Sequence, residues 1–380
     1  MADLLLTLAG RKFTAGAYAG GAVVQLNSSG TWVELTNGGA IAWNLNEFTF
    51  SDGSTVLFYI QSAGFVTLER PQPGTLFRSI DLGVTWANVT PSSGPVEFAN
   101  DIAQDADGNL WLITDERKSS ADEDDPEKFS RVYKSIDKGA TWTLKYTSTN
   151  GGRPIFFRNI TCHPTNNSKI IIDATEQVSA EIRLVRSLDG GATWTVFTPS
   201  IGGTNLGGAR QSVFNYTSTG AIVWAGSFVT ANAKTYVFRS VDDGSTWTNQ
   251  YEEAVSLGVS TGFAEANGVI YVVTSPFLFS ATPAIGAVTK IAADTSSPFT
   301  TAHIMHGISR HAVSDVSTLL LGCGVSSPAA ESSIFTRPAD LSSDWAVHPK
   351  ASNMSANLGY VLYVERLGVI GATPSPTPET

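Results

Sequence analysis

An eight-residue pattern, Ser-x-Asp-x-Gly-x-Thr-Trp, occurs four times in this chain of 380 residues and constrains its fold more than any other feature. The copies are SIDLGVTW (Ser79 to Trp86), SIDKGATW (Ser135 to Trp142), SLDGGATW (Ser187 to Trp194) and SVDDGSTW (Ser240 to Trp247). Their tryptophans are 56, 52 and 53 residues apart. Five fixed positions at a nearly constant spacing indicate an architecture of repeated supersecondary units.

Three weaker copies extend the repeat to both ends of the chain. They are LNSSGTWVEL around Trp32, FSATPAIGAVTKI (Phe279 to Ile291, with its hairpin ending near residue 288) and RPADLSSDWAV around Trp345. Trp32 and Trp345 are 313 residues apart, which makes six steps with a mean of about 52. Seven units therefore fill residues 1–372 as one domain, and the Pro-rich tail, residues 373–380, is predicted to leave it in an extended conformation.

Each copy has the chemistry of a β-hairpin turn. An apolar strand precedes it, the Asp carboxylate can accept hydrogen bonds from turn amides, Gly supplies a positive φ, and Trp begins the next strand. Two earlier strands precede each hairpin, such as EFANDIAQD and NLWLITD in the third unit. Four strands per unit predict an all-β, seven-bladed β-propeller of four-stranded antiparallel blades. We expect the C-terminal stretch, residues 357–372, to pair with the blade begun by residues 4–35 and so close the ring.

The four strong copies resemble the Asp-box, or bacterial neuraminidase repeat (BNR), of sialidases, sortilin-type receptors, xyloglucan-active glycosidases and photosystem II assembly propellers. The resemblance implies the propeller fold. It also implies that the box lies at the turn between the third and fourth strands, on the rim away from the usual ligand face. The box residues are then structural: Asp81, Gly83, Trp86, Asp137, Gly139, Trp142, Asp189, Gly191, Trp194, Asp242, Gly244 and Trp247.

Composition excludes several function classes. A formal charge of −10 and a pI near 5.0 disfavour nucleic acid and acidic membrane surfaces as partners. No apolar run approaches the roughly 20 residues needed to cross a bilayer. Asp3 lies where a signal peptide would be positive, so we expect a protein made in the cytoplasm that begins near Met1. Cys162 and Cys323 are expected to be buried free thiols.

Three arginines recur at nearly the same sequence distance before the tryptophan of their repeat. Arg158, Arg210 and Arg310 are each expected to start a first strand, and they precede the tryptophan of their unit by 36, 37 and 35 residues. Equal phase predicts equal height along the central axis, where three guanidiniums would bind a carboxylate or sulfate. Sialidases use an arginine triad in this way. The alternative is that each arginine pairs with an acid or a backbone carbonyl of the next blade.

No catalytic residue can be assigned. The Arg-Ile-Pro tripeptide of the sialidase pattern is absent, and the only close grouping of a tyrosine with acids on the expected ligand face is Tyr251 with Glu252 and its neighbour. Asp115 and Glu116, with Glu69 or Glu252, could supply a glycosidase pair, although nothing in the sequence brings them together.

Metal and cofactor sites are not expected. His303, His306 and His311 lack a metal-site spacing, and the acidic run of residues 121–129 is typical of a solvated loop rather than of a calcium loop. The patterns of phosphate-binding and dinucleotide-binding loops are absent.

Three functions fit these observations. The first is a non-catalytic propeller that recognises a protein or a glycan. Its composition resembles that of a bacteriophage virion or tail protein, with a protein assembly partner or a cell-surface glycan as its ligand. The second is a sialidase-like or other glycoside hydrolase that uses the central axial pocket. The third is an assembly factor similar to the photosystem II propellers.

Overall fold

The computed structural model is built from β-strands. It describes the side chains of residues 46–60, 74–81, 83–91, 98–115, 129–148, 155–176, 181–199, 212–226, 234–253, 262–274, 277–291 and 344, and the backbone of the strands outside these ranges. Within the described residues, no helix is long and apolar enough to span a membrane. The C-terminal tail, residues 373–380, lies outside the described residues.

Six antiparallel meanders of four strands, here called blades 2 to 7, occur within the described part of the chain. Blade 2 contains β6 (Ile41–Thr49), β7 (Thr55–Ser62), β10 (Gly74–Ser79) and β11 (Ala87–Asn88). Blade 3 contains β12 (Glu97–Gln104), β13 (Leu110–Glu116), β14 (Ser130–Ser135) and β15 (Thr143–Thr147). Blade 4 contains β16 (Ile155–Cys162), β17 (Ile170–Glu176), β18 (Ile182–Ser187) and β19 (Thr195–Phe197).

Blade 5 contains β22 (Ala209–Tyr216), β23 (Ile222–Phe228), β24 (Lys234–Ser240) and β25 (Thr248–Glu253). Blade 6 contains β26 (Ser260–Ala266), β27 (Val269–Thr274), β28 (Phe277–Ala281) and β29 (Val288–Ala293). Blade 7 contains β30 (His303–Arg310), β31 (Thr318–Val325), β32 (Ser333–Pro338) and β33 (Ala346–Pro349). β28 and β29 pair as a hairpin across the weak copy at 279–291.

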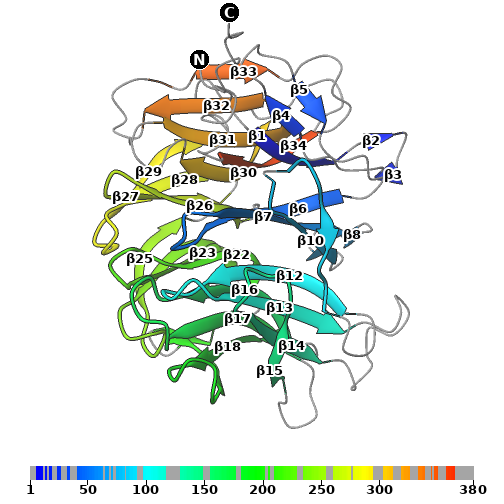
Figure 1. Ribbon diagram of the computed structural model, residues 1–380. Helices are drawn as coiled ribbons and strands as arrows, with labels where there is room; N and C mark the ends of the chain where they lie inside the picture. The colour runs from blue at the N-terminus through cyan, green and yellow to red at the C-terminus, as the bar shows by residue number, and fades with distance from the viewer. Residues whose placement is uncertain are drawn as a thin grey trace, which may run out of the picture.

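Successive blades meet through their first strands. β12 lies against β16, β16 against β22, β22 against β26 and β26 against β30, so these strands form the inner layer of the molecule. Two strands from opposite ends of the chain, β1 (Leu6–Arg11) and β34 (Asn357–Tyr363), pair antiparallel and lie side by side in Figure 1. β4 (Val24–Leu26) pairs with β5 (Trp32–Glu34) close to β1.

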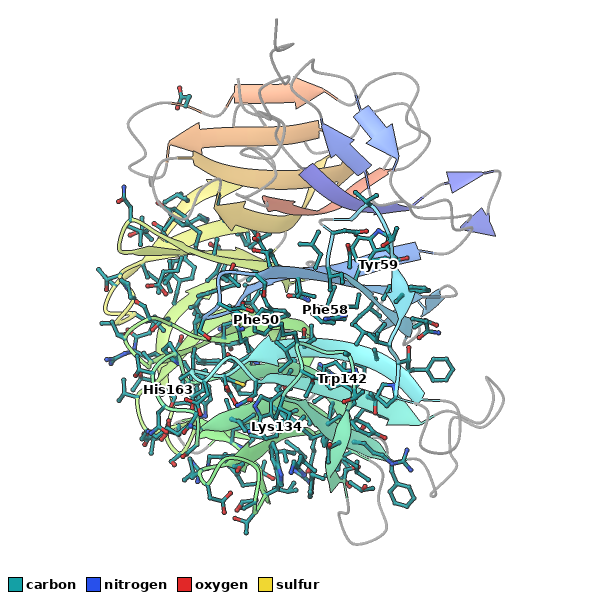
Figure 2. The ribbon with its side chains drawn as sticks, viewed as in Figure 1. Phe50, Phe58, Tyr59, Lys134, Trp142 and His163 are labelled. Atoms are coloured by element: carbon teal, nitrogen blue, oxygen red, sulfur yellow. The ribbon has the colours of Figure 1, made fainter. Side chains whose placement is uncertain are left out.

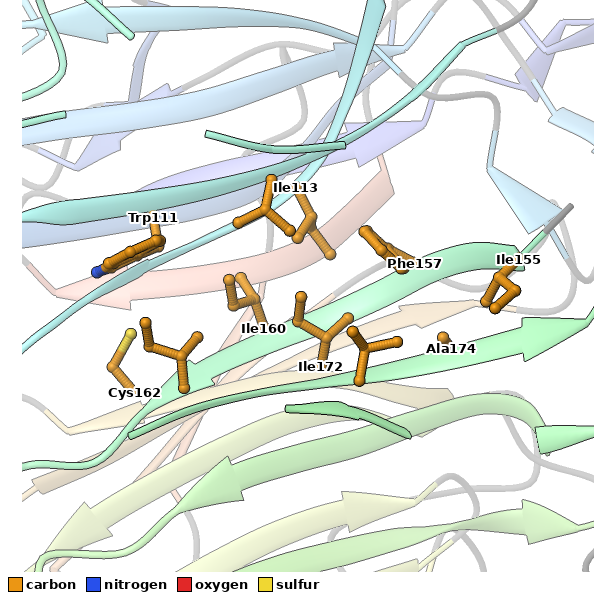
Figure 3. Packing of buried hydrophobic residues seen from close by; sticks show 11 residues of the cluster. Trp111, Ile113, Ile155, Phe157, Ile160, Cys162, Ile172 and Ala174 are labelled. Atoms are coloured by element: carbon orange, nitrogen blue, oxygen red, sulfur yellow. The ribbon is translucent and has the colours of Figure 1, made fainter. Parts of the chain in front are cut away.

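The core lies between the blades. The second strands are almost continuous apolar runs, as in Ile170–Ile172, because each is covered on both faces by a neighbouring sheet. Figure 3 shows this packing between blades 3 and 4, where Trp111 and Ile113 face Ile160, Cys162 and Ile172. Cys162 is a buried free thiol, as the sequence predicts, and burial raises its pKa well above the usual value.

The four strong repeats form the hairpin between the third and fourth strands of blades 2 to 5. In blade 4 the Ser187 hydroxyl donates to Asp189 Oδ1 at 2.8 Å and accepts from Gly191 N at 2.8 Å. Asp189 also accepts from the Thr193 amide at 2.8 Å and the Thr193 hydroxyl at 2.6 Å. The same hydrogen bonds recur in blades 2, 3 and 5. The prediction that the Asp carboxylate locks the turn is confirmed, although the fourth strand begins one residue after Trp.

Arginine side chains join some of these turns to the preceding blade. Arg78, the residue before the box of blade 2, donates to the carbonyl of Lys138 in the box of blade 3 at 2.7 Å. Arg186 of blade 4 donates to the carbonyl of Asp243 in blade 5 at 2.8 Å. Lys138 and Asp243 both have positive φ, so the two accepting carbonyls belong to equivalent residues of their turns. Consecutive boxes therefore lie at the same end of their blades.

Candidate functional site

A polar network lies where the first strands of blades 3 and 4 meet. Asn100, on β12, donates from Nδ2 to Asp115 Oδ2 at 2.7 Å and to the carbonyl of Phe157 in the next blade at 3.0 Å. The Ser130 hydroxyl donates to Asp115 Oδ1 and to the carbonyl of Ile155 at 2.7 Å. Asp115 and Ser130 are buried, whereas Asn100 is half-buried.

The same arrangement recurs one blade further on. Asn159, on β16, donates to Asp173 Oδ2 at 3.2 Å and to the carbonyl of Ser212 in blade 5 at 3.2 Å. The Ser212 hydroxyl also donates to Asp173. The half-buried guanidinium of Arg158, next to Asn159 in sequence, interacts electrostatically with Asp173. We call Asn100, Asp115, Ser130, Arg158, Asn159, Asp173 and Ser212 the axial polar cluster.

Burial dominates the electrostatics of Asp173. Its side chain is fully buried, and loss of hydration raises its pKa above the usual value, although Arg158 and the hydrogen bonds from Ser212 and Asn159 act in the opposite direction. Asp173 Oδ1 has no hydrogen-bond partner among the described residues. Asp173 is thus a buried carboxyl group that interacts electrostatically with Arg158, rather than an acid open to solvent.

Strand register does not place the three predicted arginines at one height, so the equal-height prediction is wrong. Arg158 lies in the middle of β16, within a bulge between the pairs Phe157↔Ala174 and Asn159↔Asp173. Arg210 is the second residue of β22, in a bulge between Ala209 and Ser212. Arg310 is the last residue of β30, where it pairs with Leu319. Only Arg210 lies near the start of its strand. Bulges and unequal turns change the distance from the tryptophan to a given level of the first strand.

Tyr251 and Glu252 lie on β25, the outermost strand of blade 5, and not with the arginines on the first strands. Glu252 forms an ion pair with Lys234 on the neighbouring strand. The Tyr251 hydroxyl donates to Glu253 Oε2 at 3.0 Å, and the ring packs on Phe279 of blade 6. Burial and Glu253 raise the pKa of Tyr251, which disfavours the phenolate that a nucleophile would need.

The other predicted acids are not brought together in the described structure. Asp115 belongs to the axial polar cluster, whereas the side chains of Glu69 and Glu116 lie outside the described residues. The side chains of His303, His306, His311, Arg210 and Arg310 and the acidic residues 121–128 also lie outside them. Among the side chains that are described, no group of three or more His, Cys, Asp or Glu residues is placed to hold a metal ion.

Sequence reasoning missed Asn100, Asn159, Ser212 and the buried role of Asp173. A signal was present, because NDI at 100–102 and RNI at 158–160 occupy the same place in consecutive first strands. The second strands of the same two blades each carry an Asp, in LITD and IIID. The two alignments give the Asn–Asp pair only in blade 4, because in blade 3 they place Asn100 opposite the position of Arg158, and Asp115 lies two residues beyond the position that matches Asp173.

The fold is shared with known carbohydrate-active proteins. The chain matches no protein-family model and no curated protein. Among solved structures it is similar to a protein of unknown function from Dyadobacter fermentans, with 14% identity, a TM-score of 0.51 and coverage of 81% of this chain and 95% of that one. It is also similar to an α-L-arabinofuranosidase from Fusarium graminearum, bound to an iminosugar inhibitor, with 14% identity, a TM-score of 0.50 and coverage of 78% and 92%.

A Hadza microbial sialidase is similar at 12% identity and a TM-score of 0.52, covering 79% of this chain and 66% of that one. At these identities the likeness concerns the fold alone. The chain therefore has an all-β fold of antiparallel four-stranded sheets, a β-propeller like those of sialidases and related glycosidases.

Proposed function

We propose that this protein is a glycan-recognising β-propeller. It binds its saccharide on the first strands of blades 4 and 5, next to the axial polar cluster. The observation that carries the proposal is the position of Arg158, a cationic residue in the bulge of the first strand β16 that interacts electrostatically with Asp173. The guanidinium supplies donors in a fixed fork that a saccharide carboxylate or sulfate accepts, whereas the Asn159 amide and the Ser212 hydroxyl already donate within the cluster and hold it in place. Arg210, on β22, the first strand of blade 5, is the second residue that we propose to bind the glycan.

A panel of neutral, carboxylated and sulfated glycans tests this proposal. We expect binding of a carboxylated or sulfated glycan that Arg158→Ala and Arg210→Ala each weaken. Arg239→Ala is the matched control, because Arg239 lies on the third strand of blade 5, away from the inner layer. Thermal unfolding of each variant separates loss of binding from loss of fold. If both inner-strand variants bind as the wild type does, or if no glycan binds the wild type, the proposal is wrong.

A second candidate function is glycoside hydrolysis, favoured by the glycosidases among the structural neighbours. Such an enzyme needs two carboxyl groups flanking the scissile bond. Asp115 and Asp173 are buried and hydrogen-bonded, whereas Asp101, on β12, is only half-buried and accepts from the Ile160 amide at 2.9 Å. Turnover of fluorogenic arabinofuranosides or sialosides that is lost in Asp101→Asn would favour hydrolysis. Binding without turnover would favour recognition alone.

We propose a bacteriophage particle as the setting for this recognition, with the cell-surface glycan of a host as ligand. Low charge and simple Gly-, Ser- and Thr-rich repeats support this setting. Mass spectrometry of purified particles tests it: the protein should be present at a fixed copy number relative to the major capsid protein. Its absence from such particles would remove the setting and leave the glycan site to be tested separately.

We also propose that the propeller has seven blades and that β34, β1, β4 and β5 form blade 1. The antiparallel β1–β34 pair supports this, as does the position of β34 against β30 on one side and β6 on the other. Leu8 and Val361 are register partners in the pair. A Leu8→Cys/Val361→Cys variant should therefore form a disulfide that Leu8→Cys/Asn357→Cys does not. Equal cross-linking of the two variants would contradict the closure.

A further inference from the structure

The second position of the repeated turn carries an exposed apolar side chain in four consecutive blades. Ile80, Ile136, Leu188 and Val241 are 66%, 83%, 50% and 63% exposed. Among the described residues only two other large apolar side chains are exposed to this degree, and one of them, Val84, lies in the same turn as Ile80. Isolated exposed apolar residues need no explanation, but their return at one position of each repeat does.

These four side chains lie at the same end of neighbouring blades. The box of blade 3 meets blade 2 through the bond from Arg78 to the carbonyl of Lys138, and the box of blade 5 meets blade 4 through the bond from Arg186 to the carbonyl of Asp243. The pattern stops at blade 6, where the polar residue Thr282 holds the corresponding position. We call Ile80, Ile136, Leu188 and Val241 the apolar arc.

The arc is also anionic. Each of its residues is followed directly by the box aspartate, namely Asp81, Asp137, Asp189 or Asp242. The partners of these carboxylates within the turn are neutral hydroxyl and amide groups, so the turn itself does not neutralise its aspartate. Asp137 also interacts electrostatically with Arg78 of blade 2. Lys138, the lysine within these turns, is already paired with Asp52. A complementary surface must therefore offer apolar groups to cover the arc and cations to meet its carboxylates.

We propose that the apolar arc is a docking surface for a protein partner that presents apolar side chains interspersed with lysine or arginine. A second copy of this chain fits less well, because it would bring four box carboxylates against four others in a chain of net charge −10. The surface lies on the turns between third and fourth strands, so this binding is separate from the glycan site proposed on the first strands.

A synthetic peptide of alternating leucine and lysine residues is the probe, with leucine–glutamate and serine–lysine peptides as comparisons. Titration by fluorescence anisotropy should show that the wild type binds the leucine–lysine peptide more tightly than either comparison. The double variant Ile136→Ser/Leu188→Ser should weaken this binding by about tenfold, corresponding to about 1.4 kcal/mol. Leu144→Ser is the matched control, since Leu144 is 45% exposed but lies on β15 outside the turns.

The variants are not expected to unfold, because the replaced side chains are mostly exposed, and urea denaturation checks this. Equal binding of the peptide by the wild type and the double variant would overturn the proposal. So would equal affinity for the leucine–glutamate peptide, or no binding of the leucine–lysine peptide at all. Concentration-dependent dimerisation that the double variant abolishes would assign the arc to a second copy of the chain instead.

Discussion

Gly191, in the box of blade 4, packs directly against the indole of Trp111 in blade 3: a Cβ at Gly191 would lie 2.4 Å from Trp111 Cη2. Two other box glycines make the same approach, Gly139 to Phe58 and Gly244 to Ile171. Phe58 and Trp142, which lies in the same turn region as Gly139, are labelled in Figure 2. The repeated glycine thus allows a hairpin turn and also lets the second strand of the preceding blade fit beneath it.

Gly191→Ala should therefore destabilise the fold strongly. The residue has a φ of 86°, so alanine adds backbone strain to the clash with Trp111. We expect a loss of about 3 kcal/mol in the free energy of unfolding, measured by urea denaturation. Gly268→Ala is the matched control: its φ is 68°, but nothing lies within 4 Å of an added Cβ, so only the backbone cost of about 1 kcal/mol remains. Equal losses in both variants would contradict the packing role.

The two arginines that precede the boxes of blades 4 and 5 should differ in their contribution to stability. Arg186 donates to the Asp243 carbonyl at 2.8 Å and the Ser245 hydroxyl at 2.6 Å, and it lies over the Phe197 ring. Arg239, at the same place in blade 5, has a buried Nε without a hydrogen-bond partner among the described residues. The turn of blade 6, which lacks the Ser-x-Asp-x-Gly pattern, provides no acceptor for Arg239 Nε among the described residues.

Arg186→Ala should thus lower the free energy of unfolding by about 2 kcal/mol, whereas Arg239→Ala should change it by less than about 0.5 kcal/mol. Chemical denaturation of both variants in parallel gives the comparison. A loss in Arg239→Ala as large as that in Arg186→Ala would show that the interblade hydrogen bond is not what stabilises this junction.

The architecture could be predicted from the sequence because it is local and repeated. Ser187, Asp189, Gly191 and Thr193 make their turn contacts within one hairpin, so their spacing alone specifies them. The height of Arg158 could not be predicted, since it depends on a bulge in β16 that no residue type announces. The Asn159–Asp173 contact depends on the register of β16 on β17, which the same bulge sets, and the burial of Asp173 depends on the neighbouring blade. The period of the repeat specifies neither.

The aspartate of the repeated turn should make the free energy of unfolding depend on pH in the acidic range. Hydrogen bonds from the Thr193 hydroxyl and amide, followed by that from Ser187, lower the pKa of Asp189 to about 2. Because the folded pKa is below the unfolded value, the contribution of Asp189 is complete above about pH 4 and disappears as the pH falls toward 2. Asp189→Asn should be less stable than the wild type at neutral pH, with a difference that shrinks on acidification. A difference that does not change with pH would exclude the ionised carboxylate as its source.

Asp173 should show the opposite dependence, because burial raises its pKa in the folded state. The folded protein then holds a proton that the unfolded chain has released, so the contribution of Asp173 is most favourable below the unfolded pKa and is lost as the pH rises through the folded one. The free energy of unfolding of the wild type minus that of Asp173→Asn should therefore fall as the pH rises from acid toward neutral.

Arg158→Ala should extend this fall to higher pH, since removing the guanidinium takes away a group that favours the ionised carboxylate. Denaturation curves of the wild type and the two variants across this pH range measure both effects, and a difference that increases with pH would contradict the burial of an acid beneath the first strands.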